Sequence, residues 1–208
     1  MEHVDAYCER LTDALWAEPL NAVSNLAFLI AAALLWRLRP VAGGLRALPV
    51  LLALVGLASL AFHTWATRLT GALDSGFIAL FVLYYPVVFA HWFLGVRWSR
   101  AWLAVPAFVV FAAATSPLAA LMPGGSYLAP WLALVVITVV AAVRGLPWRE
   151  LAVAAALFAG SLALRTLDQP LCGVWPSGTH HAWHVLNAAV LFLVARAAIR
   201  RERPAGRT

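Results

Sequence analysis

Apolar residues dominate seven stretches of the chain, and polar residues gather in the short segments between them. The apolar stretches cover residues 19–38, 47–65, 71–94, 101–118, 128–143, 151–167 and 180–199. Each is close to the roughly 20 residues that a helix needs to cross a bilayer, although the fifth is short. The connecting segments are rich in glycine, proline and arginine, which is typical of turns. The pattern predicts an all-helical (all-α) integral membrane protein with seven transmembrane helices.

The composition supports a membrane location and changes the interpretation of the charge. The chain is 63% hydrophobic and 12% charged, whereas a soluble domain is roughly 45–50% apolar and about 25% charged. Every cationic side chain is an arginine, and the formal net charge is +6. In a soluble protein this charge would suggest nucleic-acid binding, but arginines beside apolar spans act as topology determinants. We therefore expect a membrane protein and no nucleic-acid partner.

The arginines fall mostly on one side of the predicted membrane. The side that holds the loops after the first, third and fifth spans and the C-terminal tail carries most of them, and the other side has only Arg10, Arg68 and Arg165. By the positive-inside rule, the C-terminus is cytoplasmic and the N-terminus is outside. We expect an extracytoplasmic N-terminal segment at residues 1–18, a seven-helix membrane domain at 19–199 and a basic cytoplasmic tail at 200–208.

Five polar residues inside the spans are predicted to lie at one depth. Ser59 and His63 are near the outer end of the second span, Asp74 opens the third, and His180 and His184 open the seventh. An Asp within a span costs roughly 2.5–3.5 kcal/mol on insertion scales, so it is retained where something compensates for it. Three helices thus bring these side chains together near the extracytoplasmic face.

The spacing of the histidines predicts a metal site. His180 and His184 are four residues apart, so both imidazoles project from one helix face, as two ligands do in a HExxH zinc site. His63 would be a third ligand and leave a fourth position for water, as in catalytic zinc sites. Asp74 could then hold or deprotonate that water, and Ser59 could donate a hydrogen bond to a developing oxyanion. Zinc is therefore the predicted cofactor, with Asp74 and Ser59 as catalytic residues.

Some of these residues also have an ordinary structural interpretation. Asp74 could be a helix N-terminal residue that the helix dipole favours. Ser59 could be a small residue that lets two membrane helices approach closely. His181 could replace His180 as the ligand that accompanies His184, at a spacing of three residues.

Three short motifs and the N-terminal stretch give the chain a resemblance to a known family. The motifs "SLAFH", "LDS" and "HHAWH", in this order, and the stretch "YCERLTDALWAEPLNAVSNLAFLI" resemble the alkaline ceramidase family of the CREST superfamily. The resemblance implies a zinc-dependent intramembrane amidase, with the three histidines as ligands, Asp74 activating water and Ser59 assisting at the oxyanion. This agrees with the interpretation drawn from the residues themselves.

Eukaryotic members of that family carry a calcium site in the N-terminal segment, and the match here is partial. Glu9 and Glu18 occupy recognisable positions, whereas the Asp expected two residues before Cys8 is displaced to Asp5, and the Asn expected three residues after it is Leu11. Calcium takes six to eight oxygen ligands, so the resemblance implies a weakened calcium site at Asp5, Glu9 and Glu18. Alternatively, the acidic residues of this segment form a solvated outer tail.

The chain contains two cysteines, Cys8 and Cys172, and the arginine distribution places both outside. That compartment permits disulfides, so the pair suggests one bridge between the N-terminal segment and the sixth loop. The alternative is two buried thiols that act as apolar filler.

Together these features predict an enzyme that hydrolyses the amide bond of ceramide or a similar N-acyl lipid to a fatty acid and an amine. Ceramide is implied by the resemblance alone. The lipid substrate would reach the site from the bilayer, and the sequence does not indicate an oligomeric state.

Two other classes of protein fit the metal motif. One is a seven-span receptor of the progestin and adiponectin receptor type, whose N-terminus is cytoplasmic, and the other is a transport or scaffold protein with a structural metal.

Overall fold

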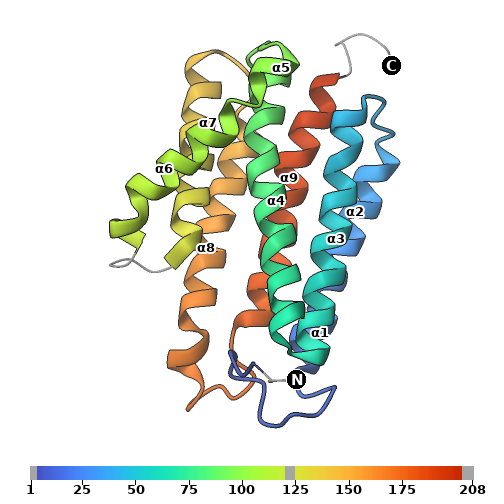
Figure 1. Ribbon diagram of the computed structural model, residues 1–208, viewed down its shortest axis with the longest axis vertical. Helices are drawn as coiled ribbons and strands as arrows, with labels where there is room; N and C mark the ends of the chain where they lie inside the picture. Colours follow the sequence, from blue (N-terminus) through green and yellow to red (C-terminus); the bar gives the residue numbers. More distant parts are fainter. Residues whose placement is uncertain (1–3, 120–124, 203–208) are drawn as a thin grey trace.

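The computed structural model describes residues 4–119 and 125–202, and the regular structure in this part of the chain is helical. Seven helical segments within these residues are long and apolar enough to cross a membrane. They lie side by side in one bundle (Figure 1). The prediction of an all-helical, multi-pass membrane protein with seven spans is confirmed.

Three of the seven spans contain more than one helical element. The elements in chain order are α1 (Pro19–Ser24) and α2 (Leu26–Arg37) in the first span, α3 (Gly43–Trp65), α4 (Arg68–Trp92), α5 (Trp98–Ala101) and α6 (Ala104–Ala119) in the fourth span, η1 (Gly125–Tyr127) and α7 (Leu128–Val143) in the fifth, α8 (Arg149–Leu171) and α9 (His180–Glu202).

Several helices extend beyond the predicted spans, and α3, for example, begins at Gly43 rather than at residue 47. Helix α4 begins at Arg68 rather than at residue 71, because Thr67 and Thr70 cap its first turn reciprocally. Helix α8 continues to Leu171 instead of ending at residue 167. Helix α9 runs to Glu202, so the first three residues of the predicted tail are helical, and residues 203–208 lie outside the described part of the chain.

Helix α9 occupies the middle of the bundle (Figure 1) and packs against α2, α3, α4 and α8. Small buried residues, among them Ala188, Ala195 and Ala198, let the neighbouring helices approach closely. Helix α6 lies at the periphery, and the described structure buries little of its surface. The central position of α9 places its first turns, with His180 and His184, among the neighbouring spans.

The two ends of the bundle differ in what they contain. The N-terminal segment, the α3–α4 connection and the start of α9 lie at one end, and the loops after α2, α4 and α7 lie at the other, with the last described turn of α9 (Figure 1). The second end carries most of the arginines. The extracytoplasmic location of the first end stays a prediction from the positive-inside rule.

Candidate metal centre

His63, His180 and His184 form a buried group that could hold a metal ion. His63 lies in the last turn of α3, and the other two lie in the first turns of α9. One ligand atom from each residue lies within 4.8 Å of the others, and the three side chains are 0–1% exposed. The structure therefore brings together the three residues that the sequence pattern selects, while His181 does not belong to the group.

Hydrogen bonds at Nδ1 orient two of the imidazole rings, those of His63 and His184. His63 Nδ1 donates to Glu18 Oε2 at 2.6 Å. Ser24 donates its hydroxyl hydrogen to the Asn21 carbonyl, so at the 2.7 Å contact of Ser24 Oγ with His184 the ring Nδ1 is the donor. Both rings are thereby held in the tautomer that leaves Nε2 with a free lone pair. Metal-bound histidines are commonly oriented in this way by a hydrogen bond from the other ring nitrogen.

The ring nitrogens without a hydrogen-bond partner indicate whether the site suits a metal ion. Nε2 of His63, Nε2 of His184 and both ring nitrogens of His180 are buried and have no hydrogen-bond partner within the described part of the chain. Buried polar atoms without a partner are costly and rare. Three neutral imidazoles that converge on one point suit zinc better than calcium or magnesium. The residues present fit a zinc ion, which His63, His180 and His184 would hold.

Asp74 and Ser59 lie beside this group, as predicted. Asp74 is in the second turn of α4, and Ser59 is one helical turn before His63 in α3. The Asp74 carboxylate interacts electrostatically with His63, and the Ser59 side chain lies next to it. Ser59 Oγ and Asp74 Oδ1 are both buried without a hydrogen-bond partner of good geometry in residues 4–119 and 125–202. These two oxygens are thus available to a water or substrate at the metal.

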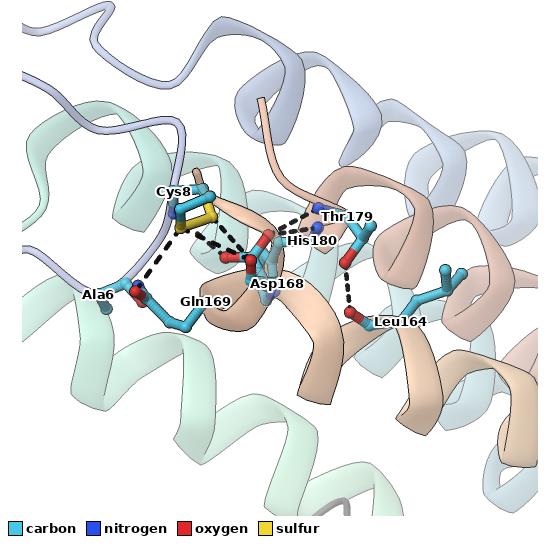
Figure 2. Close-up of a disulfide and its surroundings, with 8 residues drawn as sticks. Ala6, Cys8, Leu164, Asp168, Gln169, Thr179 and His180 are labelled. Carbon is cyan, nitrogen blue, oxygen red and sulfur yellow. Dashed lines mark hydrogen bonds between the residues drawn. A yellow bond between two sulfur atoms is a disulfide. The ribbon is translucent and has the colours of Figure 1, made fainter. Parts of the chain in front are cut away.

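Asp168, which the sequence analysis did not single out, fixes the start of α9. Its Oδ1 accepts hydrogen bonds from the backbone N–H groups of Thr179 at 2.7 Å and His180 at 2.9 Å (Figure 2). A carboxylate at a helix N-terminus satisfies free N–H groups and is favoured by the helix dipole. The chain reaches this position through Gly178, whose φ of +61° favours glycine and whose missing Cβ leaves room for Asp168. Asp168 therefore sets the position of His180.

The disulfide between Cys8 and Cys172 is present, which confirms the predicted bridge. The same Asp168 carboxylate also accepts a hydrogen bond from Cys8 N at 3.2 Å, and Gln169 Nε2 donates to the Ala6 carbonyl at 2.9 Å (Figure 2). The bridge and these hydrogen bonds join the N-terminal segment to the end of α8. They place that segment directly over the histidines.

Tyr7 is a second residue that the sequence analysis missed. Its ring stacks on His180 with the centroids 3.7 Å apart and lies 5.1 Å from the His63 ring. Burial raises the pKa of the Tyr7 phenol above its usual value, so the side chain is neutral at physiological pH. Because Cys8 is its chain neighbour, the disulfide holds Tyr7 against the histidine group.

The three carboxylates predicted as a calcium site do not converge as a metal-binding group. Asp5 is exposed. Glu9 accepts hydrogen bonds from the backbone N–H groups of Leu20 at 2.7 Å and Asn21 at 2.8 Å, and so caps α1. Glu18 instead pairs with His63 and with an arginine, Arg10.

Arg10 supplies a cation in the region where the resemblance implied calcium. Its side chain is buried, and its Nε donates to Glu18 Oε1 at 2.5 Å. Its other nitrogens donate to the carbonyls of Thr12 and Ala14 and, at 3.3 Å, to that of His63. Burial opposes ionisation of Glu18, but hydrogen bonds with His63, Asn21 and Arg10 outweigh it and hold the pKa of this carboxyl below its usual value. The Arg10 guanidinium therefore already neutralises Glu18 at the place where a calcium ion would do so.

A cavity of about 350 Å³ lies among α4, α6, α7 and α8. Ser75, the neighbour of Asp74, lines it, together with apolar residues of α4, α6 and α7. Its volume falls within the roughly 300–1,000 Å³ that is usual for small-molecule sites. One of its walls is the peripheral helix α6.

No protein-family model and no curated protein matches this chain. The resemblance to alkaline ceramidases therefore rests on the residues and motifs described above.

Proposed function

We propose that the protein is a zinc-dependent amidase that hydrolyses ceramide or a similar N-acyl lipid within the membrane. The observation that carries the proposal is the buried group of His63, His180 and His184 with free ring nitrogens, beside an unpaired carboxylate oxygen of Asp74. A structural metal would need only the histidines. A buried carboxylate that keeps one oxygen free next to them is what hydrolytic chemistry requires in addition.

The proposed roles follow from the positions of the side chains. A zinc ion held by the three histidines would supply Lewis acidity and a water whose pKa falls to about 7. Asp74 takes the proton of the attacking water and later passes a proton to the departing amine nitrogen, which leaves poorly without one. Ser59 Oγ donates a hydrogen bond to the carbonyl oxygen of the amide as negative charge develops on it.

The cavity beside Asp74 supports a lipid as substrate. Most of its lining is apolar, with residues such as Ile78, Val82 and Phe108. An acyl chain can lie along these residues while its amide reaches Asp74 and the histidines. Entry from the bilayer would take place past α6.

The test of the proposal is the Asp74→Asn variant. Asn keeps the shape of the side chain and a hydrogen-bonding oxygen, but it cannot accept the proton. We expect zinc content and folding to be unchanged and hydrolysis of N-acyl lipids to fall roughly 10²–10⁴-fold, the usual effect of losing a general acid or base. Ser59→Ala should lose on the order of 10²-fold or less if its hydroxyl is only one of several contacts to the oxyanion.

A matched control is Asp13→Asn, which makes the same change at an exposed position of the N-terminal segment and should leave the rate unchanged. If Asp74→Asn hydrolyses N-acyl lipids at the unmodified rate, the proposed mechanism is wrong. If the unmodified, zinc-loaded protein cleaves no N-acyl lipid, a receptor or scaffold with a structural metal replaces the enzyme.

A further inference from the structure

Arg165 is a charged residue inside a span that neither the metal centre nor the proposed chemistry uses. It lies in α8, six residues before the helix ends at Leu171. Within the described part of the chain it has no carboxylate partner, and its contact is with the ring of Tyr127, 4.8 Å from the guanidinium carbon. Charged residues inside spans are rare and usually mark a functional site or pair with an opposite charge.

Arg165 lines the cavity among α4, α6, α7 and α8. Arg165, Tyr127, Ser75 and Ser126 are polar residues in its lining, and the rest of the lining is apolar. A cavity with a cation and several hydroxyl groups at one place is built to hold a ligand that is polar at one end and apolar at the other.

This polar part of the cavity lies close to the metal centre. Tyr127, under Arg165, contacts the ring of Trp183 at 5.8 Å, and Trp183 in turn stacks on His180 at 4.9 Å. The charge of Arg165 also acts on Asp74. A ligand group paired with Arg165 would therefore be near the amide bond that Asp74 and the histidines attack.

The apolar part continues away from the metal centre. A second, smaller cavity of about 60 Å³ shares Val82, Phe108 and Pro130 with the first. It extends along α9 to Val190 and Val194, which follow His184 by several residues toward the opposite end of the bundle. The lining of this part is apolar and suits an acyl chain chemically, which leaves the polar part for the amine portion of the substrate.

We propose that the substrate is an N-acyl lipid whose amine portion carries an anionic group, such as a carboxylate, and that Arg165 pairs with this group. The inference rests on the proposed amidase function and narrows it, because ceramide has no charge. The substrate class is then that of N-acyl amino acids. Arg165 is a specificity-determining residue that does not take part in bond cleavage.

The first experiment compares two amides with the same acyl chain on the zinc-loaded, full-length protein in neutral nanodiscs. N-lauroylglycine carries a carboxylate and N-lauroylethanolamine does not. A charge-assisted hydrogen bond corresponds to about 10–100-fold in affinity, so we expect kcat/KM to be higher for the glycine compound by about this factor. Arg165→Gln should remove the preference, so that the ratio of kcat/KM for the two amides falls to about one, and Arg165→Lys should retain most of the preference.

The second experiment measures binding without turnover, in the zinc-loaded Asp74→Asn protein. N-lauroylglycine should bind about 10–100-fold more tightly than N-lauroylethanolamine, and the difference should disappear with Arg165→Gln. Arg196→Gln, which removes an arginine in α9 at the opposite end, is the matched control and should change nothing. Laurate is included to separate the substrate from the fatty acid product.

The outcomes separate the two proposals. Equal, Arg165-independent binding and cleavage of both amides refutes the anion site and leaves the amidase standing. An Arg165-dependent binding preference without cleavage of either amide refutes the amidase and supports the anion site. If laurate binding depends on Arg165 while the two amides bind equally, Arg165 holds the fatty acid product, and the proposed substrate class is wrong.

Discussion

Removing the guanidinium of Arg10 should destabilise the protein more than removing an ordinary surface arginine. In Arg10→Met the apolar part of the side chain is roughly retained, but Glu18 becomes a buried carboxylate without its ion partner. Both side chains of the pair are 2% exposed, and Arg10 also donates to the carbonyl of His63 at 3.3 Å. Breaking a buried ion pair by removing one partner costs about 3–5 kcal/mol.

The measurement is thermal unfolding of the zinc-loaded protein in detergent. For a chain of this size, each kcal/mol corresponds to about 2–4 °C in Tm, so the expected decrease is roughly 6–20 °C. The matched control is Arg196→Met, which breaks the partly exposed pair between Arg196 and Glu150, whose side chains are 27% and 26% exposed. A pair at that exposure contributes about 0–1 kcal/mol, and its loss should lower Tm by only a few degrees.

Two further measurements test whether the unpaired charge of Glu18 causes the loss of stability. In the double variant with Glu18→Gln no unpaired charge remains, so Tm should recover part of the loss seen with Arg10→Met alone. Calcium or a calcium chelator should not change Tm of the unmodified protein, because the guanidinium already neutralises Glu18. If Arg10→Met lowers Tm no more than Arg196→Met does, the buried ion pair does not make the expected contribution to stability. A calcium-dependent rise in Tm would support a calcium site at Asp5, Glu9 and Glu18.

Two other predictions concern the metal and the disulfide. Purified protein should contain about one zinc per chain by elemental analysis, and a variant with alanine at positions 63, 180 and 184 should contain none, so full occupancy in that variant contradicts the site. Cys8→Ser should lower the free energy of unfolding by on the order of 4–5 kcal/mol in the chain-entropy model, since the bridged residues are 164 positions apart. Unfolding of the unmodified protein with and without reductant checks this second value, and coincident curves would count against it.

The spans and the histidine group could be predicted because the signals are local. The bilayer requires about 20 apolar residues for each helix, and the sequence meets this requirement seven times. The four-residue spacing of His180 and His184 fixes their common helix face wherever the helix lies. His63 joined them by an argument about depth, which needs only the order and direction of the spans. The packing of α3 against α9 then brings His63 next to His180 and His184.

The residues that position this group could not be predicted in the same way. Asp168 lies in a stretch with proline and glycine that reads as a loop, and nothing near it in sequence shows that its carboxylate accepts from Thr179 and His180. Tyr7 is one aromatic residue in a polar segment, and its stacking on His180 depends on the Cys8–Cys172 bridge. Such contacts join segments far apart in the chain, so they appear only when the helices are packed.

The few arginines on the arginine-poor side of the bundle carry information beyond the orientation of the spans. The positive-inside rule treats all arginines as equivalent charges and gives a side from their excess. An arginine on the opposite side works against that excess, so a specific contact should compensate for it. Arg10 has such a contact in Glu18, and Arg165 lies in a cavity wall over Tyr127. If the charge of Arg165 serves an anionic substrate, these exceptions to the rule mark the functional end of the bundle as directly as the histidines do.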